Sequence, residues 1–402
     1  MSADQLDFSS LDLFSDEILA DPFPIYASIR DAAPAVWLER SRCWAVGRYS
    51  DVRRALTRHQ IFRSGEGIGL TPEANALQKG SVLSSDPPVH GALRSVLNDR
   101  MSPAGLQGER EPIQRAADIL IDRLVSRQSF DAVEDLAKAF PVMVVLDLIG
   151  IPHAVRPRLL DWADALFNTF GPPNERTMKS LPVLQEFAEY IFNVERETLA
   201  AGSLAAALYE ARDREVITSH QAAVLLGAYL GAGLDTTINS ISAAIYRLAT
   251  NPDQWQLLRE HPDLIPRAYD EVLRIDSPVL AFTRYVAEAT DIDGIPIPAG
   301  DRVLLLYASA NRDPRKWTDP DRFDIRRAPM DHLAFGVGRH LCAGQLLARI
   351  EVESLLRALT SRVARIEVGT PAIHLNNVLR GLRSLPVTVH AETTARPLVG
   401  QH

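Results

Sequence analysis

HLAFGVGRHLCAG, residues 332–344, is the most informative segment of this 402-residue chain. Leucine and isoleucine residues follow it at helical spacing, so a helix is predicted over residues 343–363. Cys342 therefore stands at the expected start of a helix, where the helix dipole and free backbone N–H groups favour the thiolate. The segment thus presents one potentially ionised sulfur among three glycines.

A dinucleotide-binding loop and a zinc site are two other possible interpretations of this segment. A dinucleotide-binding loop would use the glycines of residues 336–338, but it needs a third glycine where the chain has Leu341, and no strand-rich unit precedes it. A zinc site would use His332, His340 and Cys342, but a fourth ligand at plausible spacing is missing from the neighbouring sequence. Neither pattern is complete.

A single thiolate ligand beneath a flat cofactor is the third possibility. Gly336, Gly338 and Gly344 remove side chains where a bulky planar group must approach the backbone. A lone thiolate is one way in which proteins hold haem iron for O–O cleavage. An isolated buried cysteine is usually structural, so only the full spacing around Cys342 favours a haem ligand.

A long apolar segment over residues 216–250 predicts a helix. Thr218 and Gln221 form a capping box at its start, and the dipeptide at 251–252 ends it. Its length would suit a membrane span, but its middle contains glycine, threonine, asparagine and Asp235, which hydrocarbon would penalise. The segment is better interpreted as the central helix of a large soluble core.

The middle of this helix contradicts local preferences. Gly231 and Gly233 each cost about 1 kcal/mol in a helix interior, and a charged Asp235 follows them. Such sites are candidates for function, because glycine beside threonine can open the backbone ladder into a groove. The alternative is that Thr236 merely bonds to a carbonyl one turn earlier.

The overall composition limits the class of protein. The net charge is −8, which argues against nucleic-acid binding. The two cysteines, Cys43 and Cys342, cannot build a disulfide framework, and the acidic start lacks the features of a signal peptide. We therefore expect a cytoplasmic protein that binds neither nucleic acid nor membrane.

The rest of the chain reads mostly as helix, with few strands. Helical spacing is found over 115–124 and 182–199, and strand patterns cluster at 37–49 and 292–306. Because no linker or repeat interrupts the sequence, one large domain with short flexible ends is expected.

Taken together, these segments resemble the cytochrome P-450 family of haem-thiolate monooxygenases over residues 20–390. The glycine-rich cysteine segment matches the haem-binding signature, AGLDTT at 232–237 matches the oxygen-activation motif, and EVLR at 271–274 matches the Glu-x-x-Arg motif. The resemblance implies a mainly α, single-domain fold with small β-sheets and a long central helix crossing over haem b. It places the domain at 21–392, between a flexible segment at 1–20 and a flexible tail at 393–402.

The resemblance also implies roles for individual residues. Cys342 would be the axial iron ligand, and Asp235 and Thr236 would be the catalytic pair that passes protons during O2 activation. Glu271, Arg274 and Arg322 would form a structural charge network. The other residues expected at the haem are His90, Arg94, Ala232, Gly233, Arg284, Phe335, Gly336, His340 and Gly344. Among these, His90 and Arg94 lie four apart on one helical face, suited to the haem propionates, although a solvated surface pair would have the same spacing.

The family's substrate pocket lies over the haem. Its expected wall residues are aromatic, aliphatic or small, which favours a compact apolar cavity for a planar ring, although each could instead be simple core packing. They are Ile68, Leu70, Phe167, Phe170, Ala228, Gly231, Val279, Leu280, Phe282 and Leu379, together with Glu66.

A closer resemblance is to the bacterial subfamily that demethylates para-methoxybenzoates. Residues 166–175, 309–315 and 342–346 carry it. That subfamily anchors the substrate carboxylate with an arginine where this chain has Glu66, and with an Arg-Ser pair where it has Gly227 and Ala228. A small neutral aromatic substrate, such as a methoxyarene or phenol, is therefore expected in place of a benzoate.

The expected partners follow from the resemblance. Electrons would come from a ferredoxin and its separate reductase, because the chain lacks cysteines for an iron–sulfur cluster. The ferredoxin would dock on the cysteine side, near Arg94, Arg100 and Arg339, and the enzyme would be a monomer.

Several other functions remain open at this point. They are hydroxylation of a larger natural product or terpenoid, direct use of peroxide, gas sensing by a non-enzymatic haem protein, and a helical interaction protein without cofactor. The intact Asp235 and Thr236 disfavour peroxide use, which needs no proton relay to O2.

Overall fold

The computed structural model of the chain describes residues 7–392. Helices dominate it, as expected. The α-helices are α1 Asp16–Ala20, α2 Phe23–Ala32, α3 Tyr49–Thr57, α4 Pro72–Leu77, α5 Val89–Met101, α6 Arg110–Arg127, α7 Ala139–Ile149, α8 Arg156–Asn168, α9 Glu175–Asn193, α10 Leu204–Asp213, α11 Ser219–Ala232, α12 Asp235–Thr250, α13 Pro252–Glu260, α14 Ile265–Ile275, α15 Tyr307–Ala310 and α16 Gln345–Arg362. The π-helix η2 Ala132–Lys138 leads into α7, and short 3-10 turns are η3 His153–Val155, η4 Arg196–Thr198, η5 Pro262–Leu264 and η6 Gly338–His340.

The strands form small sheets. Their bounds are β1 Val36–Leu38, β2 Cys43–Val46, β3 Phe62–Arg63, β4 Ser129–Asp131, β5 Ala281–Val286, β6 Thr290–Ile292, β7 Ile295–Ile297, β8 Arg302–Leu306, β9 Val363–Val368, β10 Ala372–Leu375, β11 Arg380–Ser384 and β12 Pro386–Ala391. The largest sheet has the order β1-β2-β8-β5-β3, and in it β2 and β8 pair in parallel with Trp44 opposite Val303. The others are β4-β12-β9, β10-β11 and β6-β7.

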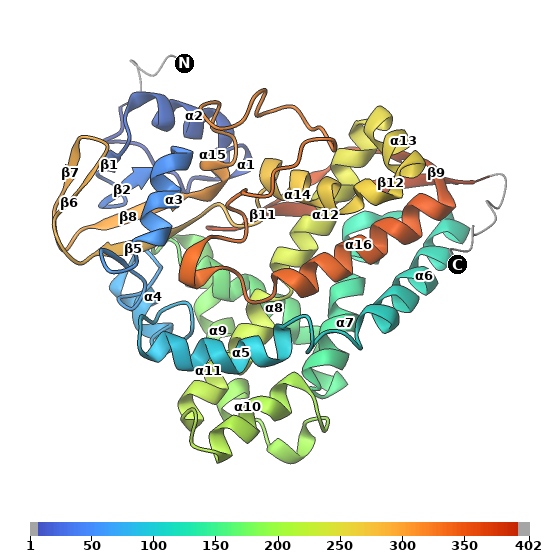
Figure 1. Cartoon of the computed structure of the whole chain (residues 1–402), viewed down its shortest axis with the longest axis horizontal. Coiled ribbons are helices and arrows are strands. Elements are labelled where there is room, and N and C mark those ends of the chain that lie inside the picture. The colour runs from blue at the N-terminus through green and yellow to red at the C-terminus, as the bar shows by residue number, and fades with distance from the viewer. Residues whose placement is uncertain (1–6, 393–402) are drawn as a thin grey trace.

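The strands of the large sheet and the helices separate into two regions. Figure 1 shows the large sheet with α1, α2 and α3 on one side of the molecule, and the helical region on the other. One hydrophobic cluster fills the helical region and includes side chains of α6, α7, α8, α11, α12, α14 and α16. Two smaller clusters lie on the two faces of the large sheet.

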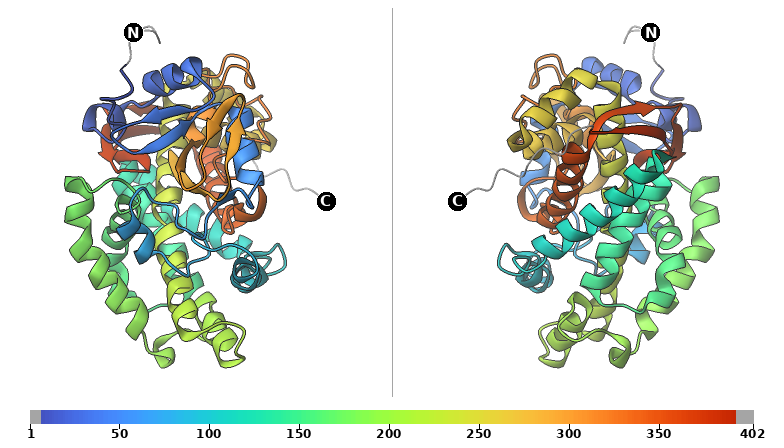
Figure 2. Two further views of the ribbon diagram at one scale, coloured as in Figure 1. Left: turned by 90° about the vertical axis from the view of Figure 1, so that its left-hand side faces the viewer. Right: turned by 90° about the vertical axis from the view of Figure 1, so that its right-hand side faces the viewer.

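The central helix is divided in two. Its start is the expected capping box, in which Thr218 accepts from Gln221 N and Gln221 accepts from Thr218 N. Helix α11 ends at Ala232, residues 233–234 form a turn, and α12 resumes at Asp235. The two helices run as one almost continuous column through the middle of the fold (Figure 2). The kink expected near Gly233 is therefore confirmed, although the single helix predicted over 216–250 is two.

Helix α9 differs from its predicted bounds of 182–199. It begins at Glu175 because the Asn174 side chain caps it by accepting from Thr177 N, and it ends at Asn193. Pro182 lies inside the helix, where it removes one backbone hydrogen bond to the preceding turn. The start of the helix is set by the asparagine cap eight residues before the proline.

The N-terminal segment is not wholly flexible. Within the predicted flexible segment, 1–20, Leu11, Leu13, Phe14 and Leu19 are buried against the large sheet. Burial of a leucine or phenylalanine contributes about 1.5–3 kcal/mol, which opposes detachment of this segment. The predicted flexible tail, 393–402, lies outside the described residues.

The apolar central segment is not long enough to act as a membrane span. Among the helices of residues 7–392, none has the length and hydropathy needed to cross a bilayer.

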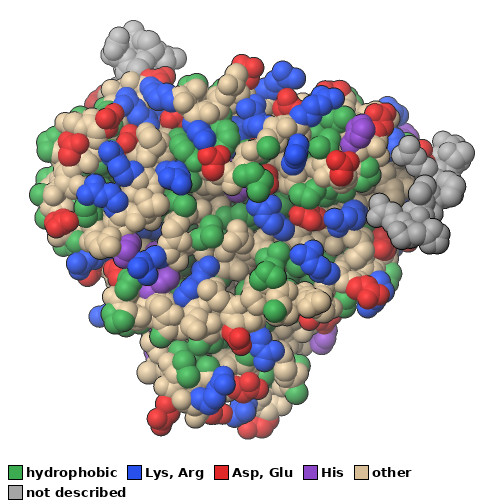
Figure 3. Space-filling model, in the orientation of Figure 1, with side chains coloured by type: hydrophobic (Ala, Val, Ile, Leu, Met, Phe, Trp, Pro, Cys, Tyr) green, Lys and Arg blue, Asp and Glu red, His purple; other side chains and the backbone are tan. Residues whose placement is uncertain are grey.

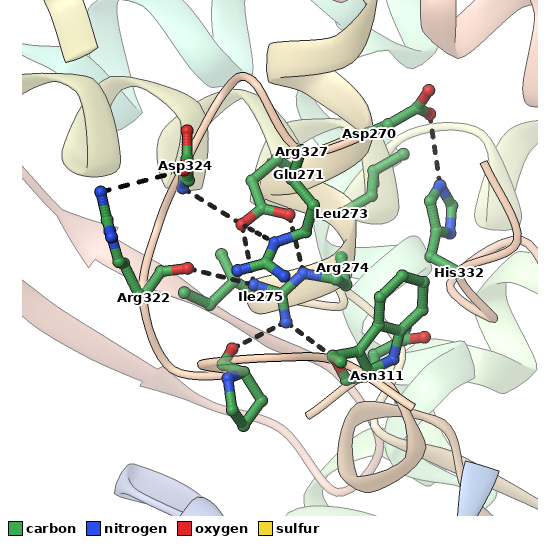
Figure 4. Close-up of polar contacts among 12 residues, drawn as sticks. Asp270, Glu271, Leu273, Arg274, Ile275, Asn311, Arg322, Asp324, Arg327 and His332 are labelled. Carbon is green, nitrogen blue, oxygen red and sulfur yellow. Dashed lines mark hydrogen bonds and ion pairs between the residues drawn. The ribbon is translucent and has the colours of Figure 1, made fainter. Parts of the chain in front are cut away.

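A buried charge network joins α14 to the loops before the cysteine segment (Figure 4). Glu271 and Arg274 are both fully buried, and the Arg274 Nε and Nη2 atoms donate to the two Glu271 oxygens at 2.7 and 2.8 Å. Arg274 Nη1 also donates to the backbone carbonyls of Asn311 and Pro320, at 2.9 and 2.7 Å. This pair therefore fixes the loop that runs toward Cys342.

The third charged member of the network is Arg327 and not Arg322. The Arg322 side chain is 66% exposed and points to Asp324, and only its backbone carbonyl accepts a hydrogen bond from Arg274. Arg327 Nε instead donates to Glu271 at 3.1 Å. The expectation for Arg322 is wrong because the loop turns its side chain outward, and only the second arginine after Asp324 faces the helix.

The network predicts different costs for the two arginines. Arg327→Ala leaves one charged hydrogen bond of buried Glu271 unmade and should lower the free energy of unfolding by about 1.5–3 kcal/mol. Arg322→Ala, the matched control, removes an exposed side chain and should change it by less than about 0.5 kcal/mol. Urea unfolding followed by circular dichroism measures both values. Equal effects of the two variants would contradict the assignment.

Candidate active site

The cysteine loop is shaped by two glycines in the left-handed region. Gly336 and Gly338 have φ of +70° and +77°, and a Cβ atom on Gly338 would lie 3.1 Å from the carbonyl oxygen of Leu56 at the end of α3. Cys342 N donates to Phe335 O at 2.8 Å, which closes the loop. Other residues at these glycines would be strained, so the sequence forms this loop for local backbone reasons.

Cys342 lies just before α16 and is only half-buried. Burial raises the pKa of its thiol, whereas the backbone N–H groups of Gly344 and Gln345 and the guanidinium of Arg94 lower it. A bound metal cation would outweigh the effect of burial, since a coordinating thiol is deprotonated outright. The sulfur is therefore placed to ligate a metal through a single thiolate.

Arginine and histidine side chains gather beside the cysteine without a matching acid. His90 and Arg94 both lie on α5, and the rings of His90 and His340 are 4.4 Å apart. Burial, together with the positive charges of Arg284 and Arg94 and the ring of His90, lowers the pKa of His340 to about 3. Neither Arg94 nor Arg284 forms an ion pair with a carboxylate of residues 7–392, and the buried Nε2 of His90 has no hydrogen-bond partner there.

This arrangement fits haem. Buried cations need anionic partners, and the two propionates of haem supply them. The uncompensated donors on α5, β5 and the cysteine loop surround the same sulfur that would bind the iron. The predicted propionate contacts are therefore brought together, whereas a solvated surface pair would not leave His90 almost fully buried.

The zinc alternative has no support in the structure. His332 is buried and lies 3.3 Å from Asp270, so it pairs with a carboxylate of α14. Residues 7–392 hold no cluster of three or more histidine, cysteine, aspartate or glutamate side chains suited to a metal ion.

The central helix presents an accessible stripe on an otherwise buried surface. Val224, Ala228 and Ala232 recur every four residues on α11 and are only half-buried, and Thr236 continues the series on α12. Thr236 Oγ1 donates to Ala232 O at 2.9 Å, across the break in the helix. The bond to a carbonyl one turn earlier therefore exists, and it spans the opened backbone expected of a groove.

The helix break lies close to the cysteine side. Ser240, one turn after Thr236, shares a hydrogen bond of 3.1 Å with Tyr269 of α14. Cys342 is near enough to Tyr269 to contribute to its raised pKa. Asp235 and Thr236 thus belong to the same region as the sulfur.

Most expected wall residues of the substrate pocket lie together. Leu70 N donates to Phe170 O at 3.0 Å, and Val279 and Leu379 form an antiparallel bridge. The ring of Phe170 lies 6.1 Å from that of Phe167 and 5.5 Å from that of Phe282. A cavity of about 10 Å³, which is only the size of one water, has five of the expected residues in its lining: Ile68, Leu70, Phe170, Leu280 and Phe282. Residues of the N-terminal segment line its other side.

Glu66 stands apart from these residues. Its side chain is exposed, and its backbone carbonyl accepts a hydrogen bond from Arg302. Solvent screens the charge of an exposed carboxylate, so Glu66 is a weak means of repelling a benzoate.

Two glycines of α11 set how closely other helices approach. A Cβ atom on Gly227 would lie 3.0 Å from Ile191 of α9, and one on Gly231 would lie 2.5 Å from Leu166 of α8. A large residue at 227 would therefore displace α9, so this chain could not hold an anchoring arginine there without rearrangement. Ala228, on the accessible stripe, has more room.

Three residues near these sites were not predicted from the sequence. Arg327 completes the Glu271 network, and Asp164 and His374 form a pair 2.7 Å apart beside Asp235. Arg327 had a weak signal, because it closely follows Arg322, the predicted partner of the Glu-x-x-Arg motif. Asp164 and His374 come from segments 210 residues apart and had none.

Comparison with known proteins agrees with this geometry. Residues 145–362 match the family described as Cytochrome P450. Cytochrome p450 CYP199A2 of Rhodopseudomonas palustris is 40% identical over 383 residues, which cover 94% of this chain and 93% of that protein. Linalool 8-monooxygenase of Pseudomonas putida is 31% identical over 403 residues, which cover 95% and 98%.

A solved structure extends the likeness to three dimensions. It is that of cytochrome P450 CREJ in complex with (4-ethylphenyl) dihydrogen phosphate, with a TM-score of 0.87, 28% identity, and coverage of 96% of this chain and 100% of that one. With the sequence matches, this shows that the chain belongs to the cytochrome P450 family of haem b monooxygenases.

Proposed function

We propose that this P450 hydroxylates or O-demethylates a small neutral aromatic substrate, using Cys342 as the haem ligand and electrons from a ferredoxin. The observation that carries the ligand assignment is the half-buried sulfur beside arginine and histidine side chains that have no acidic partner among residues 7–392. When bound, thiolate-ligated haem supplies O2 activation and O–O cleavage. His90, Arg94, Arg284 and His340 would hold its propionates.

Protons would come through Asp235 and Thr236. The Thr236 hydroxyl can both donate and accept, and it gives up its bond to Ala232 O when it turns toward the reacting oxygen. Burial and the neighbouring carboxylate of Asp164 raise the pKa of Asp235 well above its usual range, so this carboxyl group holds a proton more readily than an ordinary aspartate does. The overall reaction takes O2, two electrons and two protons, and yields hydroxylated product and water.

An aryl methyl ether is one substrate that fits. Hydroxylation of its methyl group gives a hemiacetal, which collapses to a phenol and formaldehyde. Because Ala228 lies on the stripe facing the site and no charge neighbours it on that stripe, a neutral ring is favoured over a benzoate. The packed rings of Phe167, Phe170 and Phe282 support a planar substrate.

The ferredoxin would dock beside the cysteine loop. Arg339 is exposed there, and the neighbouring α3 adds exposed Arg53, Arg54 and Arg58. Figure 3 shows Lys and Arg side chains on this face together with acidic ones. Arg94 is engaged near Cys342, and Arg100 donates to Gly202 O at 3.3 Å, so Arg339 is the strongest of the three expected contacts. The enzyme would act as a monomer.

The sulfur ligand can be tested with the two cysteines. Cys342→Ser should abolish the red-shifted absorption that the reduced, carbon-monoxide-treated protein owes to thiolate ligation. Cys43→Ala is the control, because Cys43 is fully buried in β2 and burial raises its pKa to about 12. Absorption spectra of both variants decide the point. Persistence of the band in Cys342→Ser would refute the ligand.

The proton role of Thr236 can be tested by coupling. Thr236→Ala should still bind haem and substrate, but product formed per electron pair should fall by at least about tenfold while hydrogen peroxide rises. Thr237→Ala, in the next and buried position, is the matched control. Product, peroxide and NADH consumption are measured together. Unchanged coupling in Thr236→Ala would contradict the role.

Substrate charge can be tested at Ala228. Wild-type enzyme should bind 4-methoxyphenol more tightly than 4-methoxybenzoate, and Ala228→Ser should tighten benzoate binding by about tenfold by donating one hydrogen bond to the carboxylate. Glu66→Gln, at an exposed position, should change it less than about twofold. Spectral titration gives the dissociation constants.

Two outcomes of this titration would contradict the proposal. Tight benzoate binding by the wild type would show that a carboxylate is accommodated. Tighter binding of linalool than of any arene would favour the terpenoid alternative.

A further inference from the structure

A solvent-open groove reaches Asp235, the half-buried acid of the central helix. Its volume is about 400 Å³, far above the roughly 10–15 Å³ that one water needs. It lies between α8, α9, α12 and the β10-β11 sheet, and Asp235 is part of its lining. Figure 2 shows α9 flanking the central column along this side of the molecule.

Asp235 and Thr236 face different surroundings. Consecutive residues of an α-helix project about 100° apart, so both cannot point the same way. Thr236 is bonded to Ala232 O on the accessible stripe, whereas Asp235 borders the groove. No group of residues 7–392 makes a hydrogen bond to the Asp235 carboxyl, which leaves water in the groove to contact it.

A hydrogen-bonded pair, Asp164 and His374, lines the groove together with Asp235. His374 Nε2 lies 2.7 Å from Asp164 Oδ1, to which Asn376 Nδ2 donates at 2.8 Å. Asn168 Nδ2 donates to the other carboxylate oxygen, Asp164 Oδ2, at 3.0 Å. The side chains of Asp164 and His374 are each 35% exposed, so hydrogen bonds hold the pair in place while water can reach it.

Other charged groups line the same groove on every side. They are Lys138 from η2, Asp161 from α8, Arg176 and Lys179 from α9, and Arg383 from β11. Lys138, Asp161, Arg176 and Lys179 each pair with a group outside the groove lining. After burial, the carboxylate of Asp164 is the main cause of the raised pKa of Asp235, and Lys138 acts weakly in the opposite direction.

We propose that this groove is the proton entrance of the enzyme, and that Asp164 and His374 are positioning residues that set how readily Asp235 is reloaded. Asp235 gives its proton toward Thr236 and becomes a carboxylate, and a proton from water in the groove restores the acid. Asp164, a negative neighbour, favours the protonated form of Asp235. His374, when protonated, partly cancels that effect. The proposal rests on the proposed role of Asp235.

The test is the titration of Asp235 in the holoenzyme by infrared spectroscopy. Its protonated-carboxyl band is assigned by its loss in Asp235→Asn. In Asp164→Asn the titration should move to lower pH, by on the order of one unit, because a like charge is gone. In His374→Gln, which can still donate a hydrogen bond but carries no charge, it should move to higher pH.

A remote pair provides the control. His390 and Glu367 lie 3.1 Å apart on β12 and β9, away from the groove, and His390→Gln should leave the Asp235 band unmoved. Opposite shifts in the two groove variants, with none in the control, support the entrance. Shifts in the same direction, or none, would overturn it.

Coupling measurements separate this inference from the proposed function. If Asp235→Asn leaves coupling intact, the proton role itself fails. If Asp235→Asn uncouples the enzyme while Asp164→Asn and His374→Gln leave both the band and the pH profile of coupling unchanged, only the groove proposal fails. A coupling optimum that moves with the band in each variant supports both.

Discussion

The fully buried pair of Glu271 and Arg274 is the constraint on which the cysteine loop depends. Taking two charges out of water is costly, and only complete hydrogen bonding offsets that cost. Arg274 meets this condition by also binding backbone carbonyls of the loop at 311–322, and Glu271 by accepting from Arg327. Charged hydrogen bonds therefore hold helix α14 and this loop together. The position of Cys342 follows from it, because Asn311 also accepts from Leu333 N at the start of the cysteine segment.

In the candidate active site, by contrast, charged side chains of the protein are not paired with one another. There Arg94 of α5 and Arg284 of β5 have no acidic partner in the described part of the chain, and the neighbouring histidines add hydrogen-bond donors, so the protein is complementary to an anionic cofactor. Two adjacent residues of the central helix have different surroundings. Beside the turn at 233–234, Thr236 lies on the accessible stripe and bonds to Ala232 O, while Asp235 borders the solvent-open groove.

Local signals in the sequence predicted local structure well. The Thr218–Gln221 capping box and the glycine-rich loop before Cys342 depend on neighbouring residues, and both are confirmed. Arg322 was predicted as the third member of the network, and Arg327 was not considered, because spacing does not reveal which side chain a loop turns inward. The pairing of Asp164 with His374 depends on the docking of a strand from the far end of the chain. Long-range packing, absent from any short pattern, explains these omissions.

The order of strands in the large sheet has a consequence for synthesis. Strand β2 pairs in parallel with β8, whose residues follow about 260 positions later. At typical translation rates of about 5–20 residues per second, β2 and the apolar N-terminal residues beside it wait roughly ten to fifty seconds for that partner. During this interval the nascent chain carries an unpaired, aggregation-prone edge. Folding of the large sheet therefore depends on keeping this edge from pairing with other chains until β8 has been made.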